Sequence, residues 1–184
     1  MKAAVFLATG FEEVEAVGTI DVLRRGTMEA VSVSITGEKV VTGVHGISVI
    51  ADELFEDMDF TDFDALVLPG GGPGSLMLGS HEGVLKALVK HYNEKKLVAA
   101  ICASPRIFGK LGFLEGKRAV CYPGIEPELK GAILLETPAI ADRNVITAKG
   151  PGMVFEFGIE ILGYYDDILG PCAEKVAEDL LLIS

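Results

Sequence analysis

Short apolar runs recur along the chain, separated by amphipathic segments. Runs that are continuously apolar or rich in β-branched residues are typical of strands buried on both faces of a sheet. Five such runs predict strands at residues 3–8, 31–35, 65–68, 97–101 and 144–148. Because these strands alternate with helical segments, the pattern predicts a mostly parallel sheet covered by helices on both faces.

Helices are predicted between these strands. The first covers residues 13–24, where Val14, Val17, Ile20 and Leu23 fall in a pattern close to helical spacing, and Gly26 ends it. Others are predicted at residues 84–92, from Pro105 onward, after Gly150-Pro151-Gly152 and at residues 173–182.

Residues 37–50 follow a different pattern. Two short β-rich stretches there predict an antiparallel hairpin added to the sheet. We find no linker, low-complexity tract or internal repeat, so we expect one α/β domain over residues 1–184. In parallel sheets of this kind, sites form at the carboxyl ends of the strands.

Composition narrows the class of protein. The net charge of −11 disfavours nucleic acid and anionic membranes as partners. No apolar stretch approaches the roughly 20 residues that span a bilayer, and the N-terminus does not resemble a signal peptide. The three widely spaced cysteines do not suggest a disulfide framework. We therefore expect a soluble cytoplasmic protein.

Cys102 lies between the strand predicted at residues 97–101 and the helix expected to begin near Pro105. Small neighbours such as Ala103 allow a sharp turn that presents the side chain, as at the nucleophile elbow of hydrolases. Unpaired N–H groups at such a turn favour the thiolate. A buried structural cysteine is an equally good interpretation of this position taken alone, since free cysteine is among the most buried residue types.

Two further loops end at the same edge of the predicted sheet. Pro69-Gly70-Gly71-Gly72 supplies unhindered N–H groups for an oxyanion, although glycines after a strand are also ordinary turn residues. It lacks the Lys-Ser/Thr ending of a phosphate-binding loop. In the other loop, Glu12 and Glu13 fit the acidic start of a helix. From spacing alone, the same interpretation is also the favoured one for Glu15, which lies about one turn in. The less favoured alternative is that Glu15 points toward the strand ends, where a carboxyl near a thiolate would resist ionising and donate a hydrogen bond to sulfur.

Taken together, these segments resemble the ThiJ/PfpI superfamily, in the branch of the Parkinson-disease-associated protein DJ-one and its bacterial relatives. The resemblance covers nearly the whole chain, because the matching motifs occur in the family's order and at its approximate spacing. They are Gly10-Phe11-Glu12-Glu13-Val14-Glu15-Ala16, Asp21-Val22-Leu23-Arg24-Arg25, Val67-Leu68-Pro69-Gly70-Gly71, Ala99-Ala100-Ile101-Cys102-Ala103-Ser104-Pro105 and Lys149-Gly150-Pro151-Gly152-Met153-Val154-Phe155-Glu156-Phe157.

The resemblance implies a three-layer αβα sandwich of the flavodoxin-like, class I glutamine amidotransferase-like type, usually homodimeric. It implies that Cys102 is the nucleophile-elbow cysteine and Glu15 its protonated carboxyl partner. It also places backbone N–H groups near Gly71, Gly72 and Ala103 in the oxyanion pocket.

One departure from the family concerns a histidine that members acting on amides or aldehydes often carry after the strand that follows the elbow helix. Tyr122 occupies that place here, and a tyrosine is a poor general base near neutral pH. His45 in the hairpin either approaches the pocket, from the same chain or a dimer mate, or is a solvated loop residue. His81 and His91 are expected at the surface. Protease and amidotransferase chemistry, which rely on a Cys–His pair, are disfavoured.

Two function classes share the Cys102 site. The resemblance suggests a glutathione-independent glyoxalase or deglycase acting on methylglyoxal-type carbonyls, with no cofactor. The alternative is a non-enzymatic redox sensor or chaperone whose thiol peroxide oxidises to sulfinic acid. A role in thiazole-monophosphate biosynthesis is disfavoured because no phosphate-binding signature is present. Cys121 and Cys172 are not spaced with the histidines as metal ligands, so we expect no metal.

Overall fold

A seven-stranded sheet forms the centre of the computed structural model, which describes residues 1–183. The strand order is β10-β11-β7-β6-β1-β2-β5, and every pair is parallel except β10 with β11. The sheet strands are β1 (Lys2–Leu7), β2 (Glu29–Ser34), β5 (Glu53–Leu54), β6 (Ala65–Leu68), β7 (Leu97–Ile101), β10 (Ala139–Asp142) and β11 (Val145–Ala148).

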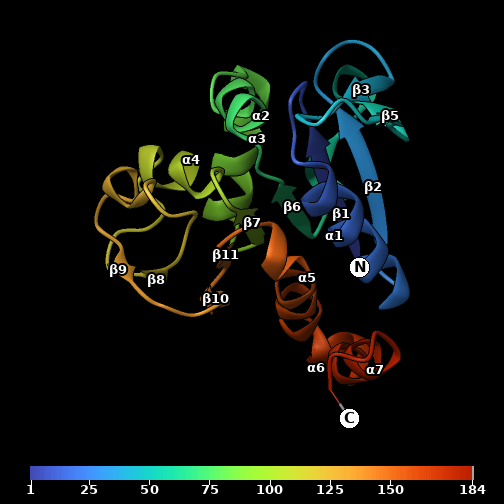
Figure 1. Ribbon diagram of the computed structural model, residues 1–184, viewed down its shortest axis with the longest axis vertical. Helices are drawn as coiled ribbons and strands as arrows, with labels where there is room; N and C mark the ends of the chain where they lie inside the picture. The colour runs from blue at the N-terminus through green and yellow to red at the C-terminus, as the bar shows by residue number, and fades with distance from the viewer. Residues whose placement is uncertain (184) are drawn as a thin grey trace.

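Helices cover both faces of this sheet, as Figure 1 shows. The α-helices are α1 (Glu13–Arg25), α2 (Gly72–Leu78), α3 (Glu82–Asn93), α4 (Pro105–Lys110), α5 (Val154–Gly163), α6 (Asp166–Leu169) and α7 (Cys172–Asp179). Short 3-10 helices are η1 (Phe55–Asp57), η2 (Phe60–Asp62), η3 (Glu126–Glu128) and η4 (Pro151–Met153).

Alternate side chains of each strand enter opposite layers, as the two-residue period of a strand requires. On one face, Ala3 and Val5 join a core with α1, α5 and α7. On the other face, Ala4 and Phe6 join a core with α2, α3 and α4. The predicted strands and the three-layer arrangement are confirmed.

The predicted antiparallel hairpin is present, but the prediction that it joins the main sheet was wrong. β3 (Val40–Thr42) and β4 (Ser48–Ile50) pair only with each other, and β5 is the strand that extends the main sheet beside β2. A second small pair, β8 (Arg118–Ala119) with β9 (Ile133–Leu134), also lies outside the main sheet. Two short strands rich in β-branched residues do not specify which edge they join, because that depends on contacts distant in sequence.

The α1 helix buries a different face from the one its apolar residues suggest. Val14 and Val17 are 54% and 50% exposed, whereas Glu15, Thr19 and Val22 are buried. These three buried positions follow the i, i+4, i+7 spacing of one helix face, but two of them are polar. This orientation places Glu15 inside the molecule.

One of the two histidines expected at the surface near the second predicted helix is instead buried. His91 is completely buried in α3, and its Nε2 lies 3.1 Å from the Phe63 carbonyl oxygen. Burial lowers the pKa of His91, so the ring is neutral. His81 is partly exposed and accepts a hydrogen bond from the Val84 N–H at the start of α3. Among the described residues, no helix is both long and apolar enough to cross a membrane.

Candidate active site at Cys102 and Glu15

Cys102 lies on a strained turn between β7 and α4. Its φ angle is +65°, a left-handed conformation that costs a non-glycine residue of order 1–3 kcal/mol. Two backbone hydrogen bonds hold the turn: the Cys102 N–H donates to the Ala148 carbonyl, and the Tyr122 N–H donates to the Cys102 carbonyl, both at 2.9 Å. The predicted strand-turn-helix placement of Cys102 is confirmed.

Gly70 separates β6 from the glycine loop and contacts both key side chains. Its N–H donates to Oε2 of Glu15 at 2.7 Å. A Cβ atom added at Gly70 would lie 2.5 Å from this oxygen and 2.6 Å from the Cβ of Cys102, with Sγ 3.1 Å away. The carboxyl and the thiol therefore pack against the same side of Gly70, which only glycine can occupy.

Glu15 is fully buried, and this changes its acidity. Burial raises the pKa of Glu15 to about 7, while hydrogen bonds from Gly70 and Cys102 oppose the rise. The other carboxyl oxygen, Oε1, is buried without a hydrogen-bond partner among residues 1–183. A carboxyl in this setting is partly protonated near neutral pH.

The thiol of Cys102 behaves differently from expectation. Burial first, and then the charge of Glu15, raise the pKa of Cys102 to about 12, although N–H groups of Gly71 and Ala103 donate toward the sulfur. The prediction from the sequence that the thiol pKa would be lowered was therefore wrong for the resting protein. That prediction included the effect of the N–H groups but not the effects of burial and of the neighbouring Glu15 carboxylate. Because two negative charges are costly at this site, the pair carries at most one near neutral pH.

The structure brings some of the predicted pocket residues to the thiol and not others. Gly71 and Ala103 lie beside the sulfur. Gly72 begins α2, and its carbonyl accepts from the Ser75 hydroxyl. Tyr122 contacts Cys102 through its backbone, while its half-exposed ring lies against Gly150.

His45 is held by Glu13. Its backbone N–H donates to Glu13 Oε1 at 2.7 Å, and its Nδ1 lies 3.0 Å from Oε2. The ligand atoms of Glu12, Glu13 and His45 fall within 4.8 Å of one another, which is close enough for a metal ion. However, the Glu13 carboxylate already accepts hydrogen bonds from the hairpin, and it serves as a clamp on that loop.

Two residues that hold the site together were not predicted from the sequence. The first is Gly70, hidden in the Pro69-Gly70-Gly71-Gly72 run, where Gly71 and Gly72 were chosen instead. The second is Ser104, a fully buried residue whose hydroxyl donates to the Pro69 carbonyl at 2.6 Å. This bond joins the glycine loop to the cysteine turn. A serine two residues after Cys102 is the signal that could have indicated it.

The raised pKa of Glu15 predicts how Glu15→Gln changes stability with pH. Because the folded-state pKa of about 7 exceeds the ordinary value of 4.5, ionisation opposes folding as the pH rises from 4.5 through 7. A neutral glutamine avoids that cost, which is about 3 kcal/mol when fully developed. Urea unfolding at pH 8 should show the variant more stable than wild type, with the difference vanishing near pH 4.5. Equal differences at both pH values would contradict the raised pKa.

Comparisons with known proteins agree with this architecture. Residues 1–163 match the DJ-1/PfpI family, and the chain belongs to that family. It is 37% identical over 179 residues to protein DJ-1 homolog B of Arabidopsis thaliana, covering 96% of this chain and 40% of that protein. The chain thus spans less than half of this plant relative. A Pyrococcus abyssi protein named as a deglycase is 33% identical over 158 residues, covering 84% of this chain and 93% of its own.

Solved structures show the same fold. Drosophila melanogaster DJ-1beta superimposes with a TM-score of 0.92 at 31% identity, covering 100% of this chain and 98% of that one. The oxidized form of Toxoplasma gondii DJ-1 gives a TM-score of 0.91 at 31% identity, covering 98% and 97%. The α/β fold and membership of the DJ-1 branch expected from the motifs are therefore confirmed.

Proposed function

We propose that this chain converts small dicarbonyl compounds such as methylglyoxal to hydroxy acids, as a glyoxalase or deglycase that needs no cofactor. The observation that carries the proposal is the fully buried Glu15 carboxyl, with a pKa of about 7, packed with the Cys102 thiol against Gly70. A carboxyl with this acidity is suited to exchange protons in both directions near neutral pH. The name of the Pyrococcus relative supports the same chemistry.

The first step is addition of sulfur to the aldehyde. Glu15 in its ionised form accepts the thiol proton as sulfur bonds to the aldehyde carbon. It then returns this proton to the former carbonyl oxygen, which gives a hemithioacetal and restores the carboxylate for the next step. The thiol therefore need not be ionised in the resting protein, because its proton has a base within reach. This accommodates the raised pKa of Cys102.

The second step moves a proton between the two substrate carbons. Glu15 removes the proton from the former aldehyde carbon, leaving an enediolate, and returns a proton to the neighbouring carbon. The product is a thioester of the hydroxy acid, which water hydrolyses to release the acid and restore the thiol. Backbone N–H groups of Gly71 and Ala103 would stabilise the enediolate oxygen.

The experiment is a glutathione-free incubation with methylglyoxal, in which lactate is measured over a range of pH. Turnover should rise as the pH passes about 7, because the first step needs Glu15 ionised. The covalent adduct should map to Cys102 when the reaction is quenched and analysed by mass spectrometry. Absence of lactate at every pH would remove the enzymatic proposal.

Redox sensing through the same sulfur is the second candidate, and the oxidized Toxoplasma relative favours it. The N–H groups beside Cys102 and the buried Oε1 atom of Glu15 could stabilise sulfinic oxygens. Mild peroxide should then oxidise Cys102 ahead of Cys121 and Cys172. Equal oxidation of all three would exclude a specific sensor.

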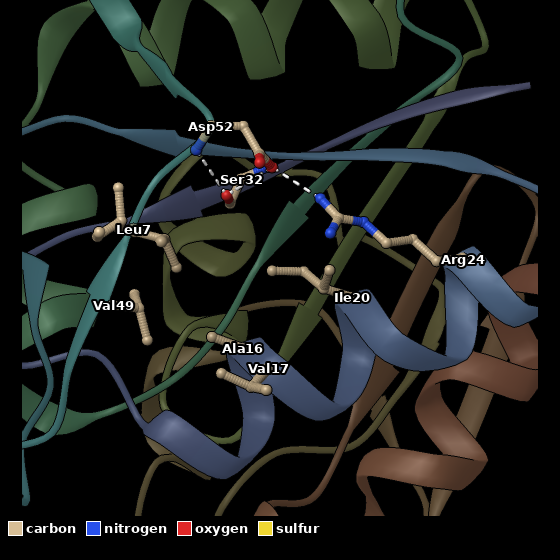
Figure 2. Close-up of a pocket in the computed structure, with 9 residues that line it drawn as sticks. Leu7, Ala16, Val17, Ile20, Arg24, Ser32, Val49 and Asp52 are labelled. Atoms are coloured by element: carbon tan, nitrogen blue, oxygen red, sulfur yellow. Dashed lines mark hydrogen bonds and ion pairs between the residues drawn. The ribbon is translucent and has the colours of Figure 1, made fainter. Parts of the chain in front are cut away.

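We also propose that the protein is a homodimer. Figure 2 shows Ala16, Val17 and Ile20 of α1 on the side facing Val49 of β4. These residues line a hollow of about 180 Å³. Its rim exposes two apolar residues, Val17 at 50% and Ile50 at 77%, beside the Arg24–Asp52 ion pair. Exposed valine and isoleucine on a helix and a hairpin are typical of a covered surface. A second copy is the occupant that the family resemblance implies.

A charge placed in this surface should separate the two copies. Val17→Asp is expected to convert the dimer to a monomer in light scattering after size exclusion, because a buried unpaired carboxylate opposes association. Val89→Asp is the matched control, since Val89 is also an exposed helical valine but lies on α3. A monomeric wild type, or a dimer unaffected by Val17→Asp, would contradict this surface.

A further inference from the structure

A cavity of about 250 Å³ lies between α2 and α4, apart from the residues of the thiol site. Ser75, Leu76 and Gly79 form one wall, and Arg106, Ile107 and Lys110 form the other, with Ser80 and Glu128 completing it. Two of these residues are cations in a chain whose net charge is −11. Glu128 is an anion, so the two cations and one carboxylate leave the cavity with one net positive charge.

Arg106 has a buried donor atom that lacks a hydrogen-bond partner among the described residues. Its side chain is 17% exposed, and its Nε atom is enclosed without a hydrogen-bond acceptor among residues 1–183. Its ion pair is long, because Nη2 lies 3.5 Å from Oε1 of Glu128, which is half-exposed. Because Nε is closed off from solvent, an anion in the cavity would contact the Nη atoms, where the long contact with Glu128 leaves N–H donors to spare.

Lys110 adds a second donor to the same cavity. Its ammonium donates to the Gly79 carbonyl at 3.0 Å, which uses one of its three N–H bonds. The two serine hydroxyls do not compete as donors, since Ser75 donates to the Gly72 carbonyl and Ser80 to the Met77 carbonyl. The free donors of the cavity therefore belong to a guanidinium and an ammonium.

We propose that this cavity binds a small oxyanion, a carboxylate or a phosphate, between Arg106 and Lys110. A planar guanidinium matches the geometry of such oxygens, and the lysine adds a point charge. The apolar atoms of Leu76 and Ile107 provide room for the remainder of a small organic acid. The site is independent of the proposed thiol chemistry, because it uses neither Cys102 nor Glu15.

The test is a nuclear magnetic resonance titration of the ¹⁵N-labelled protein with sodium phosphate in one arm and sodium acetate in the other, at constant ionic strength. Saturable shifts are expected at the backbone amides of Ser75, Gly79 and Lys110, with a Kd on the order of 1 mM. Saturation by phosphate alone assigns a phosphate ligand, and saturation by acetate alone assigns a carboxylate. Shifts that stay linear with concentration, or an enclosed water that no anion displaces, would overturn the proposal.

Variants that are expected to change the anion affinity in opposite directions distinguish an effect on binding from damage to the fold. Arg106→Gln should weaken the anion about tenfold or more, and Lys110→Met about threefold. Glu128→Gln should strengthen it about threefold, because it removes the carboxylate that competes for Arg106. If Arg106→Gln does not fold, Lys110→Met and Glu128→Gln still test whether the cavity binds the anion.

The control is Lys86→Met, which removes an equal charge from the exposed face of α3. It should leave the Kd unchanged. An equal loss in Lys86→Met and Lys110→Met would show nonspecific attraction to surface lysines and would reject the site. A Glu128→Gln variant that binds no more tightly would likewise contradict the role of Arg106.

Discussion

Methylglyoxal turnover is expected to fall roughly 10³-fold or more when Cys102 is replaced by serine. The hydroxyl is a much weaker acid and nucleophile than the thiol, and Glu15, with a pKa of about 7, is too weak a base to ionise it. The measurement is kcat/KM from lactate release at pH 8, where Glu15 is mostly ionised. The fold should survive, because the two backbone bonds that hold the turn do not involve sulfur.

Glu15→Gln distinguishes the carboxyl's chemical role from its packing role. Glutamine can still accept the Gly70 N–H bond, yet it cannot take a proton from sulfur or carbon, so turnover should fall about 10²- to 10⁴-fold. Cys121→Ser is the control. Cys121 is also a buried thiol, with a pKa raised to about 11, but it does not contact Glu15 among the described residues. If Cys121→Ser lost as much turnover as Cys102→Ser, the result would contradict the assignment of Cys102 as the nucleophile.

The two variants also separate the enzymatic proposal from redox sensing. A sensor needs the sulfur but no proton shuttle, so Glu15→Gln would remain oxidisable at Cys102. An enzyme needs both residues, so both variants would be inactive. Wild-type turnover that is zero while Cys102 still oxidises selectively would favour the sensor.

The sheet was predictable because a strand buried on both faces requires apolar residues at every position. All five residues of β7 are fully buried, and the sequence there contains no polar residue. The end of that strand fixes where Cys102 lies, and the carboxyl-end rule then indicates that the glycine loop is near it. These inferences need only local pattern and the topology of parallel sheets.

The burial of Glu15 could not be derived from the local pattern. The buried face of α1 includes a carboxyl and a hydroxyl, at Glu15 and Thr19, while two valines face outward. Hydrophobic periodicity therefore indicates only part of the buried face, since Leu23 is buried but Val14 and Val17 are not. Only the resemblance to a family indicated Glu15, because functional residues are the ones that depart from the pattern of ordinary core packing.

The pKa of Cys102 also could not be predicted from the sequence. It is the sum of opposing effects: burial and the Glu15 charge raise the pKa, and N–H groups of Gly71 and Ala103 lower it. These groups come from three loops, so their balance exists only in the folded protein. The sequence identified the N–H contribution alone, and for that reason predicted the wrong direction.

Gly71→Ala is expected to destabilise the protein by about 3 kcal/mol or more. Gly71 has a φ angle of +88°, which an alanine adopts only with strain. A Cβ atom there would also lie 2.7 Å from the Glu12 nitrogen and 2.8 Å from the Phe11 carbonyl carbon. Both atoms belong to backbone next to α1, so neither can rotate away as a side chain would. For a chain of this length, the melting temperature should fall by roughly 6–12 °C.

The neighbouring glycine provides a matched control. Apart from its two chain neighbours, Gly72 has no atom within 4 Å of an added Cβ, and it is not among the glycines with positive φ. Alanine is the better helix former at the start of α2, but a Cβ there meets the ring of Pro73, which disfavours helical geometry in the preceding residue. Gly72→Ala should therefore lower the melting temperature far less than Gly71→Ala. The two substitutions are identical in chemistry and one residue apart. A similar loss of stability in both would mean that the Gly71 backbone is not constrained as described.

The same pair tests the thiol site independently of stability. Relief of the Gly71→Ala clash requires the glycine loop to move away from α1, and this would displace the Gly71 N–H from the sulfur. Losing one such donor typically costs 10²- to 10³-fold in turnover. Folded Gly71→Ala protein, assayed well below its melting temperature, should therefore turn over methylglyoxal slowly, whereas Gly72→Ala should remain active. Full activity in folded Gly71→Ala would show that the Gly71 N–H does not stabilise the reacting oxygen, and the oxyanion role would rest on Ala103 alone.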